Sequence, residues 1–350
     1  MTVYVFNIIL ILYFSLIIYH TKIRFKDSIL LLITILPLTI ISALRHPSIG
    51  TDTVSYLLHF RIINDNNVSI FNYSMEPLFV LLNKLSYMIS TNPQIILAVS
   101  SIIISLFLFK RIIESSPYPW LSIYIYLGLY LFYQSLNGTR QYMAVAIMFY
   151  FSKYIFEKKP LRYFFGIVLA MGFHQTAIVF VPLYLINYVN QNRYVKIVIY
   201  GIFIGLLLNF NLLLSFFISL FPSYEVYQES LSVGSGGIRD IVIALAILSL
   251  GIFVNTYFKN SKSSRDLEMF MYIYLFTSIM TYLSSGNLVQ RIGWYFSIFA
   301  ILYIPSKIKD ISNKSIRNTV LFVLIFLIFI LHTYLLSTNF HRVTPYRIFF

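Results

Sequence analysis

The chain has no cysteine and very little charge. Cysteine is absent from all 350 residues, which excludes disulfides and thiolate metal sites. Only 11% of the residues are charged, whereas soluble domains carry about 25%. So few charges do not cover a water-facing surface, and a soluble globular protein is therefore excluded.

Apolar residues take the place of the missing charges. They make up 59% of the chain and form runs long enough to cross a bilayer as helices. We predict an all-α, polytopic integral membrane protein, a single transmembrane domain over 1–350 with about ten full transmembrane helices. The first run lacks a charged n-region and a cleavage site, which predicts a retained span. The runs lie near residues 3–19, 28–44, 93–109, 119–136, 141–156, 196–220, 239–257, 268–285, 292–305 and 319–336.

The basic residues predict the orientation. The net charge of +14 is concentrated in loops rich in lysine and arginine, which face the cytoplasm in membrane proteins, so we expect no nucleic-acid partner. These loops lie at 22–26, 110–111, 157–162, 190–196, 259–265 and 307–317. The resulting topology has both termini outside. Its external parts are loops 45–75, 222–238 and 286–291 and the tail 337–350.

Two segments differ from full spans. Residues 163–188 lie between two cytoplasmic loops, so they enter and leave on the same side, and we predict a re-entrant helical hairpin with its turn near 171–174. Residues 76–90 carry Asn83 and Lys84 in mid-run. For them we predict a short re-entrant or interfacial helix.

The outer side is rich in arginine rather than lysine. The positive-inside rule counts both residue types together, yet Lys84 is the one lysine expected there. Arginine binds phosphate and carboxylate oxygens with two parallel hydrogen bonds, whereas lysine acts as a point charge. The set favours recognition of an anion; the alternative is that single arginines pair with nearby acidic side chains. The outer arginines are Arg45, Arg61, Arg140, Arg239, Arg291, Arg342 and Arg347.

Two polar turns place an arginine at the start of a span. Residues 137–141 open one span, with Asn137 or Thr139 as the helix cap and Arg140 in the first turn. Loop 286–291 ends at Arg291 and opens another. Backbone N–H groups at helix starts bind anions, so Arg140 and Arg291 together predict a clamp for a diphosphate. The alternative for Arg140 is a side chain that reaches the headgroup layer.

The first external loop carries acidic and aromatic residues. Asp52, Tyr56 and Phe60 follow one another at intervals of four, which predicts a helix from Thr51 or Asp52. Three roles are open to Asp52: a base, a partner for an arginine, or the helix cap. Glu76 precedes a proline at the next helix start, where capping explains it.

One histidine lies in an apolar segment. His174 falls at the predicted turn of the hairpin. An ionisable side chain at membrane depth is a functional hypothesis by default, and imidazole titrates in the range that suits a general base. The alternative is a neutral imidazole that hydrogen-bonds a neighbouring helix. No second histidine or acid stands at metal-ligand spacing, so we expect no metal.

These residues, in this order, resemble the EpsG-type Wzy family of polysaccharide polymerases. The resemblance covers essentially the whole chain, but the chain lacks the large external loop of many Wzy polymerases outside this branch. The matching residues are Gly50-Thr51-Asp52 with Tyr56 and Phe60, Glu76 with Leu78, Thr139-Arg140-Gln141 with Ala144, Phe173-His174 with Thr176-Ala177, Arg291-Ile292 with Tyr295, and Pro345-Tyr346.

The resemblance implies a membrane glycosyltransferase. Such an enzyme moves a growing glycan from undecaprenyl diphosphate onto a lipid-linked repeat unit at the outer face of the bacterial cytoplasmic membrane, in O-antigen, capsule or exopolysaccharide synthesis. It needs no cofactor, because the lipid carrier already activates the donor. The expected partners are the undecaprenyl-diphosphate-linked oligosaccharide, the lipid bilayer, and a chain-length regulator and flippase of the same pathway.

On this hypothesis His174 or Asp52 takes the proton from the attacking hydroxyl, and Arg140 and Arg291 stabilise the leaving diphosphate. Further contacts with diphosphate and sugar are expected from Arg45, Tyr56, Glu76, Gln141, Arg239 and Gln290. Two other functions stay open. A flippase for lipid-linked oligosaccharides also needs arginines around a diphosphate, although no internal repeat is present. A membrane O-acyltransferase also relies on an intramembrane histidine.

Overall fold

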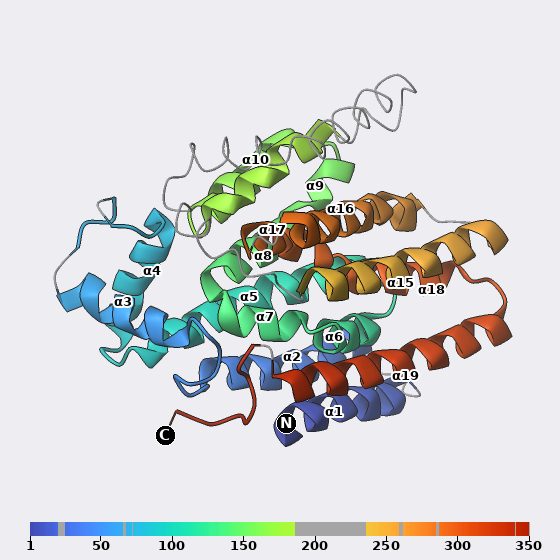
Figure 1. The fold of residues 1–350 in the computed structure, drawn as a ribbon, viewed down its shortest axis with the longest axis horizontal. Helices are drawn as coiled ribbons and strands as arrows, with labels where there is room; N and C mark the ends of the chain where they lie inside the picture. Colours follow the sequence, from blue (N-terminus) through green and yellow to red (C-terminus); the bar gives the residue numbers. More distant parts are fainter. Residues whose placement is uncertain are drawn as a thin grey trace.

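The computed structural model describes residues 1–19, 25–65, 68–71, 73–185, 236–258, 262–284, 287–339 and 341–349. Within these ranges the regular secondary structure is helical, with an isolated β-bridge between Arg45 and Ile348 (Figure 1). The elements are α1 (Thr2–Tyr19), α2 (Lys26–Ala43), α3 (Thr53–Asp65), α4 (Pro77–Ile89), α5 (Gln94–Ser115), α6 (Pro119–Gly128), α7 (Leu131–Asn137), α8 (Thr139–Phe151), α9 (Lys153–Phe156), α10 (Pro160–Met171), the 3₁₀ helix η1 (Gln175–Leu185), α15 (Gly236–Tyr257), α16 (Lys262–Ser284), α17 (Asn287–Ser297), α18 (Ala300–Asp310) and α19 (Lys314–Thr338).

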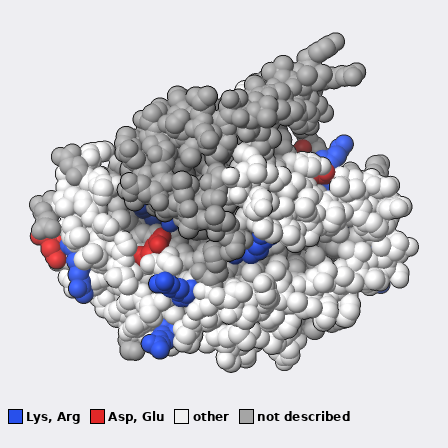
Figure 2. Space-filling model, in the orientation of Figure 1, with Lys and Arg blue, Asp and Glu red and all other residues white. Residues whose placement is uncertain are grey.

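Several described helices have the length and composition of membrane spans. Three are long and apolar enough to cross a bilayer: Gln94–Ser115, Gly237–Tyr257 and Lys314–Thr338. The 22 residues of α5 extend about 33 Å, which matches a hydrocarbon core of about 30 Å. The described residues on the face in Figure 2 are mostly uncharged, with charged side chains in small scattered groups. The structure thus agrees with the predicted all-α membrane class.

The number of spans stays a prediction. Shorter apolar helices accompany the three long ones, among them α4, α10 and η1. The predicted span 196–220 lies outside the described residues, as does loop 222–238 up to residue 235.

The two segments with unusual hydropathy form helical elements. Residues 76–90 contain α4, and α10 and η1 form two connected arms that meet at Gly172–His174. The second arm is a 3₁₀ helix with Pro182 inside it, and proline offers no backbone N–H for a helical hydrogen bond. The positions of these elements in the bilayer stay predictions.

Three of the predicted continuous spans are interrupted, and one of them, 141–156, breaks at Ser152 between α8 and α9. Segment 119–136 breaks between α6 and α7 at Tyr130, which has a left-handed φ of 69°. The break brings the Tyr130 ring against His341 of the C-terminal tail, with the ring centroids 5.4 Å apart. Segment 292–305 breaks between α17 and α18. Hydropathy does not predict these breaks, because it does not register contacts with residues far away in the chain.

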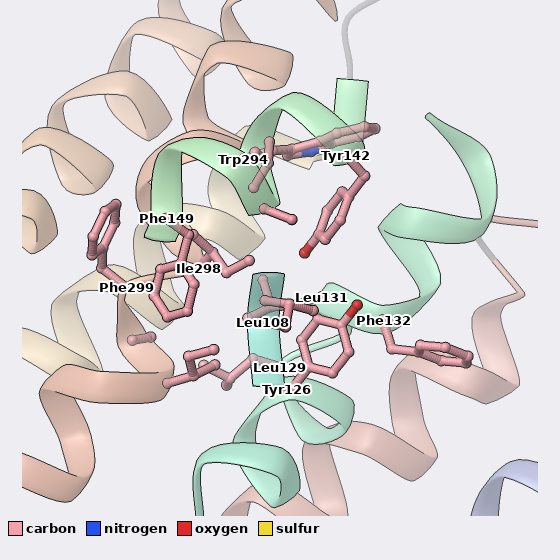
Figure 3. Packing of buried hydrophobic residues seen from close by; sticks show 14 of the residues in the cluster. Leu108, Tyr126, Leu129, Leu131, Phe132, Tyr142, Phe149, Trp294, Ile298 and Phe299 are labelled. Atoms are coloured by element: carbon pink, nitrogen blue, oxygen red, sulfur yellow. The ribbon is translucent and has the colours of Figure 1, made fainter. Parts of the chain in front are cut away.

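Aromatic packing joins the central helices. Figure 3 shows Leu108 of α5, Tyr126 of α6 and Phe149 of α8 in the same buried cluster as Phe299, which precedes α18. The Phe149 and Phe299 ring centroids lie 5.3 Å apart, and Phe299 stacks on Phe270 of α16 at 3.8 Å. Such ring pairs each contribute about 0.5–1.5 kcal/mol beyond the burial of their area. The cluster therefore fixes α5, α8 and α16 relative to one another.

The C-terminal tail folds back onto the loop after α2. The backbone N–H groups of His46 and Gly50 donate to the carbonyl oxygens of Arg347 (2.9 Å) and Arg342 (3.0 Å). The Phe349 N–H donates to the Leu44 carbonyl at 3.0 Å. Loop and tail therefore share one end of the bundle, as the predicted topology requires.

We expect Gly50→Ala to destabilise the protein. Gly50 has a φ of +85°, and an added Cβ would lie 2.7 Å from the Leu136 carbonyl oxygen. A left-handed backbone and this contact together cost about 1–3 kcal/mol, which thermal unfolding of the detergent-purified chain measures as a lower melting temperature. Ser48→Ala, an exposed change in the same loop, is the matched control. Equal melting temperatures for the two variants would contradict the strained turn.

Candidate active site

The loop before α3 is held against the junction of α7 and α8. The Thr51 N–H donates to the Asn137 side-chain oxygen at 2.7 Å. Asn137 therefore does not cap α8, although it was one of the two residues predicted to do so. The N-cap residue of α8 is Gly138, with no side-chain cap, because the Thr139 hydroxyl donates to the Ser135 carbonyl at 3.0 Å.

Arg45 is buried beside this junction. Its guanidinium donates to the Ser42 carbonyl (2.6 Å), the Thr53 hydroxyl (3.2 Å) and the Thr139 hydroxyl (2.9 Å). The residue is 0% exposed. Arg45 was predicted to contact substrate, but its burial gives it a positioning role instead: it ties the end of α2 to the starts of α3 and α8.

Glu76 joins Arg140 to the start of η1. One carboxylate oxygen lies 2.7 Å from Arg140 Nη1, and the other accepts the Gln175 N–H at 3.1 Å. Glu76 is the N-cap residue of α4 by position but makes no side-chain cap. The capping explanation preferred from the sequence was therefore wrong. A buried carboxylate favours an ionised partner over the weaker backbone donors of its own helix.

A second arginine–carboxylate pair lies beside the first. Arg291 Nη2 is 3.7 Å from Asp52 Oδ2, and the Arg291 carbonyl accepts from the Gln141 side chain at 2.6 Å. Asp52 also accepts the Thr51 hydroxyl at 2.9 Å. Of the three roles open to Asp52, the structure shows the partner for an arginine. Gln141 holds the backbone at Arg291 in place.

The close approach of α17 to α8 depends on a glycine. A Cβ on Gly138 would lie 2.7 Å from a ring carbon of Trp294. Trp294 is on α17, one helical turn after Arg291. The small residue at the start of α8 thus lets the two arginine-bearing helix starts come together.

His174 lies in the connection between α10 and η1, outside both helices. Its Nδ1 is 2.6 Å from the Thr176 hydroxyl, which in turn lies 3.1 Å from the Tyr295 hydroxyl. Burial, together with the positive charges of Arg140 and Arg291, holds the pKa of His174 well below its usual value. The imidazole is therefore neutral at neutral pH.

Tyr56 stands among the same charged groups. Burial raises the pKa of Tyr56 to about 12, Asp52 adds to this effect, and Arg140 and Arg291 oppose it. The Arg140 backbone N–H points to the Tyr56 hydroxyl at 3.5 Å. The phenol stays protonated at neutral pH and remains a hydrogen-bond donor.

The remaining predicted contacts form a neighbouring group. Arg239 Nε pairs with Asp240 at 2.9 Å, and the Gln290 side chain reaches the other oxygen of Asp240 at 3.4 Å. Both oxygens of this carboxylate thus face residues that were predicted to bind substrate. Gln290 adjoins Arg291 in the chain, so this group borders the Arg291–Asp52 pair.

The site residues share a position in their helices. Asp52, Glu76 and His174 each precede the first residue of an element, namely α3, α4 and η1. Arg140 is the second residue of α8, and Arg291 lies early in α17. Helix starts carry partial positive charge and free N–H groups. Their meeting point is suited to an anion.

Sequence reasoning assigned no role to Thr176 and Tyr295. The two hydroxyls continue the hydrogen-bonded chain that starts at His174, and Tyr295 is 0% exposed. Thr176 follows His174 by two residues, and this short spacing could have predicted the contact between the two side chains. Among 29 tyrosines, Tyr295 stands out only through its match with the family pattern together with Arg291 and Ile292.

The comparisons with known proteins identify the family. A search of curated proteins and of solved structures finds no match. The model of the EpsG family matches residues 28–348, nearly the whole chain and every site residue described above. This protein therefore belongs to the EpsG family and is a polysaccharide polymerase-like membrane protein.

Proposed function

We propose that this protein is a repeat-unit polymerase, which moves a growing glycan from undecaprenyl diphosphate onto a lipid-linked repeat unit at the outer face of the bacterial cytoplasmic membrane. The observation that carries the proposal is the pairing of two arginines with carboxylates beside a neutral, buried histidine. Family membership supports the reaction class.

The arginines bind the diphosphate of the donor. Their side chains are 23% and 22% exposed at Arg140 and Arg291, so a ligand reaches them. In the ligand-free protein Glu76 and Asp52 balance their charge and hold the guanidinium groups in place. The Asp52 pair is longer, at 3.7 Å against 2.7 Å. Diphosphate displaces Asp52 from Arg291 more readily than Glu76 from Arg140, because a shorter ion pair is stronger.

The transfer step needs a base on the acceptor side. The acceptor hydroxyl loses its proton to His174, its oxygen forms a bond to the anomeric carbon of the donor, and the bond from that carbon to the diphosphate oxygen breaks. Negative charge grows on the leaving undecaprenyl diphosphate, where Arg140 and Arg291 stabilise it. Thr176 and Tyr295 orient the imidazole. Asp52 is the competing base, because displacement from Arg291 would free its carboxylate.

Loss of the Arg140 side chain should stop polymerisation. We expect Arg140→Ala to lower the transfer rate about 100-fold or more, and Arg140→Lys to restore little, because lysine lacks the bidentate geometry. The measurement is glycan chain length on a gel, after complementation of a strain that lacks its polymerase, with expression checked. Arg61→Ala is the control, since Arg61 is an exposed arginine of α3. Full-length polymer with Arg140→Ala would refute the clamp.

If Asp52 only holds Arg291 in position, the effects of substituting the two residues on the transfer rate should not add. We then expect Asp52→Asn to reduce the rate about tenfold, and the double variant with Arg291→Ala to be no slower than Arg291→Ala alone. The rates are measured with purified protein and lipid-linked repeat units. An Asp52→Asn variant as inactive as His174→Gln would instead identify Asp52 as the base.

The pH profile tests His174. A base works only when unprotonated, and a lowered pKa moves protonation to more acidic pH. We expect the wild-type rate to stay level from pH 8 down to about 6.5, the usual pKa of histidine, and to fall only below it. His174→Gln should lose most of the activity, and its remaining rate should not decrease at acidic pH. His46→Gln, in the loop after α2, should keep both the activity and the decrease in rate at acidic pH. If the midpoint of the wild-type pH–rate profile lies above the usual pKa of histidine, His174 is not the base.

A further inference from the structure

A buried arginine lies at the opposite end of the bundle from the candidate active site. Both α5 and α8 begin at the site: the Gln94 side chain donates to the Arg45 carbonyl, and Thr139 accepts from the Arg45 guanidinium. Arg111 lies near the end of α5, about 25 Å along the axis from Gln94. Lys153 is the first residue of α9, two residues after the last residue of α8.

Arg111 carries a charge that pairs with no acidic side chain of the described residues, and its guanidinium lies over the Phe149 ring, 6.0 Å from the ring centroid. The residue is only 5% exposed. In the described part of the chain its side chain makes no hydrogen bond or ion pair, and its Nε is buried without an acceptor. Glu114 and Glu157 act on it through space. A buried guanidinium without hydrogen bonds is costly to keep.

A cavity of about 310 Å³ opens beside this guanidinium. Arg111, Lys153 and the Ser115 hydroxyl line it as donors, and Glu157 and Asp266 also line it. Two of the neighbouring acids have lysine partners: Glu114 forms an ion pair with Lys153, and Glu157 pairs with Lys159 at 2.6 Å. The positive charge of Arg111 remains available to a ligand.

The cavity also has an apolar wall. Phe156, Leu267 and Leu302 line it. Its volume is at the lower end of the range for small-molecule pockets. Three donor side chains suit the several oxygens of a tetrahedral phosphate better than the two of a planar carboxylate.

We propose that the cavity beside Arg111 is a phosphate-binding site, with Arg111 as the bidentate donor and Lys153 and Ser115 as the other donors. The phosphate comes from the headgroup of an anionic phospholipid or from a soluble phosphate compound. The apolar wall contacts the carbon portion of the bound molecule. The site is about one membrane thickness away from the candidate active site, so the proposal does not depend on the proposed polymerase reaction.

Thermal unfolding of the full chain in detergent tests the proposal. One arm adds inorganic phosphate, with chloride at equal ionic strength as the reference; the other adds phosphatidylglycerol in mixed micelles, with phosphatidylcholine as the reference. We expect one of the probes to raise the melting temperature by about 3 °C or more. A rise with inorganic phosphate identifies a soluble source, and a rise with phosphatidylglycerol alone identifies a lipid headgroup.

Three variants make the test specific. Arg111→Gln should remove the rise without lowering the melting temperature of the probe-free protein, because a buried charge is lost. Ser115→Asp should also remove it, since a carboxylate four residues along the same helix pairs with Arg111. Lys110→Gln, which deletes an exposed neighbouring charge outside the cavity, should keep the rise. The proposal is overturned if neither probe stabilises the wild type, if Arg111→Gln and Ser115→Asp still respond, or if Lys110→Gln responds no more than they do.

Discussion

The buried guanidinium of Arg45 holds together the helix ends on which the candidate active site is built. It bonds to Ser42 at the end of α2, Thr53 at the start of α3 and Thr139 at the start of α8. Truncating a buried charged donor leaves its acceptors without partners, at about 1–3 kcal/mol for each. Asp52 adjoins one of these anchors in the chain and Arg140 adjoins another. The positions of both charged site residues therefore depend on Arg45, which itself has no surface to offer a substrate.

The two arginine–carboxylate pairs give the site a defined geometry. An uncompensated guanidinium would be costly in a partly buried environment, and an arginine without a fixed partner would lose side-chain order. Glu76 and Asp52 compensate the positive charges of Arg140 and Arg291 and hold their guanidinium groups in position. The pairs differ in length and burial, with Glu76 at 5% exposure and Asp52 at 30%. One arginine is therefore held firmly, and the other is placed where a diphosphate can compete for it.

Local chemistry in the sequence was enough to predict most of the residues that the structure brings together in the candidate site. Arg140, His174 and Arg291 stand out because charge inside apolar segments is costly and rare, and Asp52 and Tyr56 follow from helical spacing. The roles were harder to predict, because they depend on residues far away in the chain. Capping is a local explanation and was preferred for Glu76, yet its partners are Arg140 and Gln175. Arg45 was indistinguishable from Arg140 and Arg291 because burial is not visible in composition. The break at Tyr130 depends on His341, which comes more than two hundred residues later in the sequence.

The helix starts explain why an anion belongs at this end of the bundle. The starts of α3, α4, α8, η1 and α17 are connected by the Asp52–Arg291 and Glu76–Arg140 pairs and by the bond from Gln175 to Glu76. Each helix start contributes a partial positive charge of about half an elementary charge, and the two arginines add two full charges. Two carboxylates offset only the arginines. The field that remains is positive, and it acts on His174 by lowering its affinity for a proton. One electrostatic arrangement thus does two things: it makes this end of the bundle suited to an anion and keeps the neighbouring imidazole neutral.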